Sequence, residues 1–219
     1  MKIAVVGLGK MGAQIAKRLI DDKHEVIAVD PNPDAVRAAT EFGAIAASDR
    51  ADGVTKFNGE QAVVWLMIPS QFVTSEIEEW IKVLPEGSLL IDGGNTDYRE
   101  TQRHAQLAAA KNVKFVDVGV SGGILGTKNG FSMMAGGDQQ SYEGLKPALD
   151  ALAAPRGGHE YFGEASSGHF VKMVHNAIEY GMMESLAEGY EILHQGPITN
   201  LDLAKVGRVW QQSSVIEST

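Results

Sequence analysis

Short apolar runs alternate with amphipathic stretches up to about residue 160 of the chain. The runs are rich in β-branched residues, as buried strands are, while the stretches between them place apolar residues at helical spacing. The pattern predicts strands near 2–6, 25–29, 62–68, 88–92 and 113–118, and helices near 11–22, 33–42, 72–83, 97–111 and 140–152. Strands that alternate with helices typically form parallel sheets, so we predict a doubly wound α/β fold.

The pattern changes after a turn-rich segment at 155–158 and a last short strand near 160–162. One long helical pattern then runs from about 166 to 195, where Gly196-Pro197 ends it, and a shorter helix follows over 200–210. This change predicts that an all-helical region follows the α/β region.

We therefore predict two domains, an α/β domain over 1–164 and the beginning of a helical domain over 165–219. A helix as long as the one predicted here needs apolar partners, and little chain remains to supply them. We expect either that another subunit supplies them, which makes a homo-oligomer, or that the chain is truncated.

The composition is ordinary for a soluble globular protein, with 44% apolar and 21% charged residues. The net charge is −9 and no basic run is present, which argues against a nucleic-acid partner. Because cysteine is absent, thiol nucleophiles and cysteine-zinc sites are excluded. The longest apolar run, 62–68, is far shorter than the roughly 20 residues of a membrane span, and no leader pattern opens the chain. We expect a cytoplasmic protein without a membrane partner.

A glycine-rich loop follows the first predicted strand and opens the first helix: Gly7-Leu8-Gly9-Lys10-Met11-Gly12. In this order of elements, Gly7 permits a tight turn, Gly9 lets the backbone approach a pyrophosphate, and Gly12 allows close packing of helix and strand. The helix N-terminus supplies an anion site. The motif predicts a Rossmann-type dinucleotide-binding domain over 1–164, although a glycine-rich turn without a ligand is the alternative.

Asp30 ends the second predicted strand, 18 residues after Gly12. An acidic side chain there accepts hydrogen bonds from the adenosine ribose and repels a 2′-phosphate. No arginine or lysine lies between Asp30 and Arg37, so the sequence favours NAD over NADP. The alternative is that Asp30 only starts the turn and caps the next helix.

Four polar residues of the long helix, Lys172, His175, Asn176 and Glu179, fall at i, i+3, i+4 and i+7 and so share one face. The residues predicted on the other, buried side are apolar or small: Phe170, Val174, Ala177, Ile178, Gly181 and Met182. The polar face is either a solvated face with a Lys–Glu pair or a catalytic set that offers a base, an acid and two orienting groups without a metal.

Two glycine-containing turns follow predicted strands, at the edge where open α/β sheets bind ligands. Ser121-Gly122-Gly123 follows the strand at 113–118, and Asp92-Gly93-Gly94-Asn95 follows the strand at 88–92. Ser121 lacks the surroundings of a nucleophile and is better suited to donate a hydrogen bond to a carboxylate. The alternative for the Asp92 turn is a simple turn without a ligand.

Together these motifs resemble the β-hydroxyacid dehydrogenase superfamily, and most closely the decarboxylating 6-phosphogluconate dehydrogenases of the shorter, often NAD-using type. The motifs that carry the resemblance are the glycine loop, Trp65-Leu66-Met67-Ile68-Pro69, Asp92-Gly93-Gly94-Asn95, Gly119-Val120-Ser121-Gly122-Gly123 and the segment from Lys172 to Gly181. Relatives of the hydroxyisobutyrate type usually carry Asn-Asn where this chain has His175-Asn176, which favours phosphogluconate.

The resemblance implies catalytic and ligand-binding roles, with no metal. Lys172, held neutral by its surroundings, would take the proton from the 3-hydroxyl while hydride passes to NAD, and Glu179 would protonate C1 of the enediol after CO2 leaves. The implied substrate-binding residues are Asn95, Ser121, Gly122, Gly123, His175, Asn176 and Tyr180. The implied cofactor-binding residues are Gly7, Leu8, Gly9, Lys10, Met11, Gly12, Asp30, Met67, Ile68, Pro69 and Asn95.

Two departures from the family pattern leave other functions open. Glu217 stands where long family members carry an arginine for the substrate phosphate, and the family continues past Thr219 into further helices. The alternatives are therefore a dehydrogenase of an unphosphorylated β-hydroxy acid, such as 3-hydroxyisobutyrate, or an NAD-binding protein without turnover.

Overall fold

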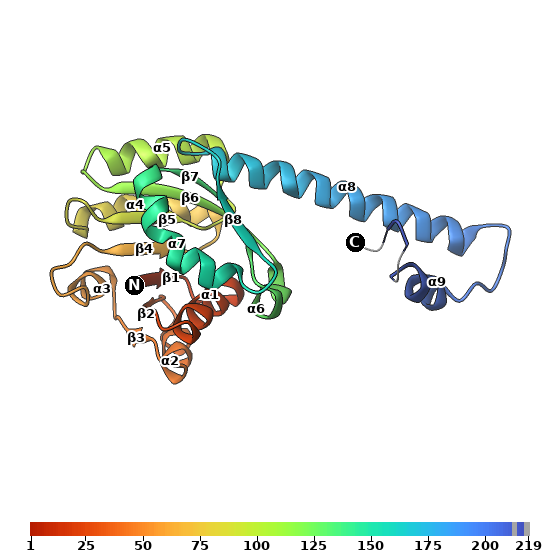
Figure 1. Ribbon diagram of the computed structural model, residues 1–219, viewed down its shortest axis with the longest axis horizontal. Coiled ribbons are helices and arrows are strands. Elements are labelled where there is room, and N and C mark those ends of the chain that lie inside the picture. The colour runs from red at the N-terminus through yellow and green to blue at the C-terminus, as the bar shows by residue number, and fades with distance from the viewer. Residues whose placement is uncertain (212–213, 217–219) are drawn as a thin grey trace. The chain divides into compact units, whose positions relative to one another are not determined.

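The computed structural model describes residues 1–211 and 214–216. Strands and helices alternate along the chain (Figure 1). The strands are β1 (Lys2–Val6), β2 (Glu25–Val29), β3 (Ile45–Ala46), β4 (Val63–Leu66), β5 (Leu89–Asp92), β6 (Lys114–Ser121), β7 (Ser132–Gly137) and β8 (Gly158–Tyr161). The helices are α1 (Lys10–Asp21), α2 (Pro33–Glu41), α3 (Arg50–Thr55), α4 (Ser70–Val83), α5 (Tyr98–Ala109), the 3₁₀ turn η1 (Gly123–Leu125), α6 (Gly126–Asn129), α7 (Gln139–Ala153), α8 (Ser167–Gln195) and α9 (Leu203–Trp210).

The strands form one sheet in the order β3-β2-β1-β4-β5-β6-β7-β8. Neighbours from β3 to β6 are parallel, and the chain order reverses beside β1, as in a doubly wound sheet. The α/β fold predicted from the sequence is confirmed, including the five strands predicted up to residue 118, although the short strand β3 was not predicted.

The strand β7 is an element that the sequence pattern did not predict. It pairs antiparallel with β6, and β8 then pairs parallel with β7. Only residues 122–131 connect β6 to β7, and they form η1 and α6. A parallel neighbour needs a crossover of a dozen or more residues, so this short connection returns the chain in the opposite direction.

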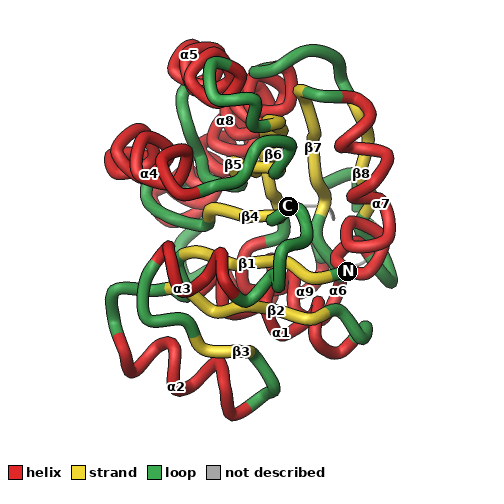
Figure 2. The backbone as a smooth tube through the Cα atoms, turned by 90° about the vertical axis from the view of Figure 1, so that its left-hand side faces the viewer, coloured by secondary structure: helices red, strands yellow, loops and turns green. Residues whose placement is uncertain are grey.

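Each face of the sheet has its own apolar core. Ile15 and Leu19 of α1 and Leu145 and Leu149 of α7 belong to the core on one face. Helix α4 fills the other face through side chains that include Trp80, alongside α5. Figure 2 shows α4 and α5 on one side of the strands and α7 on the other. The sheet is therefore covered on both faces, which fixes its ligand-binding edge at the carboxyl ends of the strands.

The chain divides into two compact units, residues 1–173 and residues 174–219, and α8 begins in the first unit. The predicted domain limits of 1–164 and 165–219 remain a prediction, because compactness alone does not define a folding unit. In the part of the chain that the structure describes, no helix combines the length and the apolar character of a membrane span.

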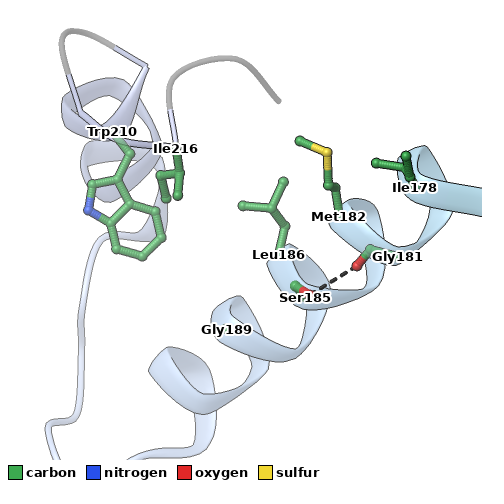
Figure 3. A pocket seen from close by; sticks show the side chains of 8 residues that line it. All are labelled: Ile178, Gly181, Met182, Ser185, Leu186, Gly189, Trp210 and Ile216. Atoms are coloured by element: carbon green, nitrogen blue, oxygen red, sulfur yellow. Dashed lines mark hydrogen bonds between the residues drawn. The ribbon is translucent and has the colours of Figure 1, made fainter. Parts of the chain in front are cut away.

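The second unit contains a hollow of about 500 Å³ between α8 and α9. Figure 3 shows apolar side chains around it, with Trp210 on one side and Leu186 and Met182 on the other. The one hydrogen bond drawn there runs from the Ser185 hydroxyl to the Gly181 carbonyl, 2.9 Å apart. Among the described residues, the lining of the hollow is mainly apolar.

The apolar side of α8 differs from the prediction. Only Gly168, His169 and Lys172 of this helix are buried, whereas Phe170 and Ile178 are 46% and 59% exposed. The prediction that the apolar side is buried was therefore wrong for this chain, because the described residues do not cover it.

The close approach of α1 to the glycine loop predicts that a larger residue at Gly12 lowers the stability of the fold. A Cβ on Gly12 would overlap the carbonyl oxygen of Gly7, so we expect Gly12→Ala to lower the free energy of unfolding by about 1–3 kcal/mol in urea titrations. Gly144 of α7 is the matched control, since a Cβ there meets nothing within 4 Å. We expect Gly144→Ala to be neutral or to stabilise by up to about 1 kcal/mol. Equal effects of the two changes would contradict this account.

Candidate functional site

The glycine loop lies between the carboxyl ends of β1 and β4. Gly7 has φ +88°, and a Cβ on it would lie 2.6 Å from the carbonyl oxygen of Met67 and 2.7 Å from a side-chain carbon of Ile68. The N–H of Gly7 donates to the carbonyl of Val29, 2.9 Å away, which joins the loop to β2 as well. Glycine is therefore required at position 7 by its backbone conformation and by the second loop beside it.

Gly9 differs from Gly7 and Gly12, the other glycines of the motif, because a Cβ on it would meet nothing within 4 Å. It is the N-cap residue of α1, and no side chain accepts a hydrogen bond at this cap. Lys10 is exposed at the first position of α1 and Met11 is half-buried behind it. Open space before an uncapped helix N-terminus fits the pyrophosphate of a dinucleotide.

Asp30 is half-buried at the end of β2 and accepts two backbone hydrogen bonds. The N–H of Leu8 donates to its Oδ2 at 2.6 Å, and the N–H of Asn32 donates to its Oδ1 at 2.8 Å. Each carboxylate oxygen retains a second lone pair, so both can still accept a ribose hydroxyl. Asn32, not Asp30, caps α2, since its Oδ1 accepts the N–H of Asp34 at 3.0 Å. Asp30 thus holds the glycine loop in the position that a dinucleotide needs.

The turn after β5 lies against the same region. A Cβ on Gly93 would overlap Trp65 and lie 2.7 Å from the sulfur of Met67. The N–H of Gly94 donates to Oδ1 of Asp92 at 3.0 Å, and Asn95 is exposed at the tip. The segment from Met67 to Pro69 leads directly into α4, whose N-cap, Pro69, supplies no side-chain acceptor. The loops that follow β1, β4 and β5 therefore lie together at one edge of the sheet.

Ser121 is the last residue of β6, so the Ser-Gly-Gly turn also lies at a strand end. Gly122 and Gly123 have φ +132° and +49°. Two residues of α1 that the sequence reasoning missed hold the segment that follows. Arg18 donates to the carbonyl of Thr127 at 2.9 Å, and the Thr127 hydroxyl donates to Oε1 of Gln14 at 2.5 Å. The helix that begins at the glycine loop thus also supports the Ser-Gly-Gly segment, a connection that no local pattern signals.

Lys172 lies on α8 directly against β6. The residue is buried, and a Cβ on Gly119 would overlap its Cβ and lie 2.8 Å from its Cγ. Gly119 thus belongs to the site for a steric reason that the sequence motif alone does not reveal.

A buried polar cluster lies behind these turns. Asp92 of β5 and Asp117 of β6 are register partners on neighbouring strands, and both are fully buried. Nδ1 of His104 lies 3.8 Å from Oδ2 of Asp92, and Nδ1 of His169 lies 2.8 Å from Oγ1 of Thr101. Asp92 is part of the turn motif seen in the sequence, whereas no motif singles out Asp117, and the register that pairs the two cannot be seen in the sequence.

The two aspartates respond differently to burial. Burial raises the pKa of Asp117, and the attraction of His169 together with two backbone N–H donors only partly offsets this effect. Burial also raises the pKa of Asp92, but the attraction of His104 and His169 outweighs it, so the pKa of Asp92 lies below its ordinary value. Asp92 is therefore the more acidic of the pair.

The remaining predicted site residues lie in the second unit, further along α8. Nδ1 of His175 is 3.3 Å from Oδ1 of Asn176 and 3.7 Å from Oε2 of Glu179. Tyr180 is 68% exposed. The imidazole, amide and carboxylate of this group thus converge on one part of the helix, as the spacing predicts. Glu217 lies outside the described residues.

Two family models match the chain in succession. The first, the NAD binding domain of 6-phosphogluconate dehydrogenase, matches residues 2–168, and the second, the 6-phosphogluconate dehydrogenase C-terminal domain, matches residues 168–218. The two matches meet where α8 begins.

Individual relatives agree with these matches. The chain is 39% identical over 219 residues to the NAD(+)-dependent, decarboxylating 6-phosphogluconate dehydrogenase of Haloferax volcanii, covering 100% of this chain and 72% of that protein. It is 36% identical to the decarboxylating enzyme of Rattus norvegicus, covering 87% of this chain and 41% of that protein. The solved Plasmodium falciparum 6-phosphogluconate dehydrogenase superposes with a TM-score of 0.83 at 27% identity, covering 96% of this chain and 47% of that one.

The family match, the open space beside Gly9 and the position of Asp30 all indicate a dinucleotide-binding domain. Identity to the archaeal relative extends over the whole chain, including the helical part. The resemblance found in the sequence motifs is therefore confirmed. The chain belongs to the 6-phosphogluconate dehydrogenase family, whose first domain is an NAD(P)-binding Rossmann domain.

Proposed function

We propose that this chain carries out the NAD-dependent oxidative decarboxylation of 6-phosphogluconate to ribulose 5-phosphate and CO2. The observation that carries the proposal is the buried Lys172 seated on Gly119, in a family member whose helix α8 continues with His175-Asn176 and Glu179-Tyr180. The chain spans 72% of its archaeal relative and 41% of its mammalian one.

Lys172 is the proposed general base. Its amine takes the proton of the 3-hydroxyl as hydride leaves C3, and a bound nicotinamide supplies the acceptor for that hydride. The resulting ammonium polarises the C3 ketone, so that the electrons left by the departing CO2 are stabilised on its oxygen. Glu179 then delivers a proton to C1 of the enediol, which completes the ketopentose phosphate.

The other predicted residues bind and orient the substrate. Asn95 lies in the turn that follows β5, and Ser121 is the last residue of β6, directly before Gly122 and Gly123. His175 and Asn176 offer hydrogen bonds to the hydroxyls, and Tyr180 is proposed to approach the phosphate. None of these roles requires a metal.

Asp30 supports a preference for NAD. Its carboxylate would accept the ribose hydroxyls and repel the additional phosphate of NADP, and the archaeal relative is named an NAD(+)-dependent enzyme. The Plasmodium structure is described with NADP+, so the family uses both cofactors. The proposed preference for NAD therefore depends on Asp30.

Residues 165–219 are proposed to begin the helical domain that binds substrate and a second copy of the chain. Exposed apolar residues on the second unit, among them Ile178, Met183 and Ile192 at 57–71%, support this proposal. Monomeric proteins rarely leave so much apolar surface in contact with water.

We expect the chain to form NADH from NAD and 6-phosphogluconate, and we expect Lys172→Met to lower kcat by about 10²- to 10⁴-fold because the general base is lost. Lys146→Met is the control, since Lys146 lies on α7 and pairs with Glu143. Initial rates are measured with NADP, gluconate and 3-hydroxyisobutyrate alongside. Turnover of an unphosphorylated acid alone would replace the proposed substrate, and NADH binding without any turnover would indicate a binding protein.

We expect Asp30→Ala to raise the dissociation constant of NADH about 10- to 100-fold, because hydrogen bonds to a charged acceptor are lost at the ribose and at Leu8. Discrimination against NADPH should fall at the same time. Fluorescence titration of both cofactors measures these changes. Asp21→Ala, at the far end of α1 in an exposed pair with Lys17, should change neither constant. Unchanged discrimination in Asp30→Ala would show that another residue selects the cofactor.

A further inference from the structure

A single buried carboxylate holds the beginning of α8. The N–H of Ser166 donates to Oδ1 of Asp117, and the N–H of His169 donates to Oδ2, each at 2.8 Å. Asp117 lies in the middle of β6, 49 residues or more from the groups it binds. It thus supplies from the sheet the acceptor that a helix N-terminus usually obtains from its own cap residue.

The chain before α8 explains why an outside acceptor is needed. Ser166 has φ +87°, a left-handed conformation that is strained for a non-glycine residue. In a usual cap, the serine side chain would accept the N–H three residues later, which here is the N–H of His169. That N–H is instead bound by Asp117, so the position of the helix depends on the strand and not on its own cap.

Glycines bring the helix into contact with the sheet backbone. A Cβ on Gly136 of β7 would overlap Ser167, and one on Gly168 would overlap the carbonyl of Met134. A Cβ on Gly119 of β6 would overlap Lys172 itself. The first turns of α8 therefore lie directly on β6 and β7. The contact leaves no free space into which the helix could move toward the sheet.

The polar groups around Asp117 come from three other elements. His169 of α8 and Asp92 of β5 both act on it, and His169 is held by Thr101 of α5. Nε2 of His169 is buried and has no hydrogen-bond partner among residues 1–211 and 214–216. The carboxylate is thus enclosed by polar groups and does not contact solvent.

Lys172 follows His169 by three residues, so the two lie on the same side of α8. We propose that Asp117 is a positioning residue for Lys172: by holding the N–H groups of Ser166 and His169, it fixes the axial position and rotation of α8 at which the lysine meets Gly119. The inference rests on the proposed function for its effect on catalysis, although the placement of Lys172 is independent of turnover. A displacement of about 1 Å at a reacting group can cost about 100-fold in rate.

The test compares Asp117→Asn with Asp138→Asn. Both aspartates accept backbone N–H groups at the start of a helix, since Asp138 accepts the N–H of Ser141 at 2.8 Å, but α7 carries none of the proposed site residues. Asparagine preserves the volume of the side chain and replaces one acceptor oxygen by an NH₂ group, which cannot accept. The measurements are kcat, KM, the NADH dissociation constant and the ¹³C resonance of the Lys172 side chain across pH, assigned with Lys172→Arg.

We expect Asp117→Asn to lower kcat about 10- to 100-fold with less than a 2-fold change in NADH affinity, and to shift the Lys172 resonance and its titration. Asp138→Asn should leave kcat and the resonance unchanged. An unchanged Lys172 resonance in Asp117→Asn, or an equal change in both variants, would overturn the inference, as would a changed resonance with parental kcat. If the parent chain has no turnover but the resonance still shifts in Asp117→Asn alone, the proposed function fails while the positioning of Lys172 by Asp117 stands.

Gly119→Ala provides a second variant if Asp117→Asn does not fold. It leaves the carboxylate intact and introduces the overlap with Lys172 directly. We expect it to shift the same resonance and to lower kcat by a similar factor, without changing the affinity for NADH. A parental resonance in this variant would show that the contact between β6 and the lysine does not set the position of Lys172, and would overturn the inference.

Discussion

The carboxylate of Asp117 joins the sheet to the long helix, and the proposed position of Lys172 depends on that connection. Two backbone N–H groups at the start of α8 donate hydrogen bonds to its carboxylate oxygens, and the Asp117 side chain is buried. Hydrogen bonds to a charged acceptor are shorter and stronger than neutral ones, and a negative charge at a helix N-terminus is further stabilised by the helix dipole. These contributions offset part of the cost of burying the charge, and the pKa of Asp117 stays above its ordinary value because burial outweighs them.

Glycine permits the two contacts on which the proposed site depends. At Gly12 it lets α1 lie against the loop that follows β1, and at Gly119 it lets Lys172 lie against β6. In both places a larger residue would move a helix that carries part of the site. The start of α1 and the turn of α8 that carries Lys172 are thus placed by close contact with the loop after β1 and with β6, and close packing of this kind leaves little room for movement.

Asp30 combines two roles that are often considered separately. In the proposed function it selects the ribose by its charge, and in the structure it accepts the backbone N–H groups of Leu8 and Asn32. A substitution of Asp30 made to change the cofactor preference would therefore also remove a support of the glycine loop. Arg18 and Gln14 extend this coupling, because α1 also holds the segment after the Ser-Gly-Gly turn.

Local patterns in the sequence determined the parallel strands up to β6 apart from the two-residue β3, the glycine loop with Asp30, and the length of α8 up to Gly196. These features depend on residues close together in the chain, whose periodicity and turn chemistry are visible without a fold. Only the tertiary structure decided that β7 runs antiparallel, that Asn32 rather than Asp30 caps α2, and that Asp117 and Gly119 hold the helix of Lys172. The hydrogen bonds of Asp117 and the contact of Gly119 with Lys172 join residues about 50 positions apart, and strand register and helix docking, which no local pattern encodes, bring them together.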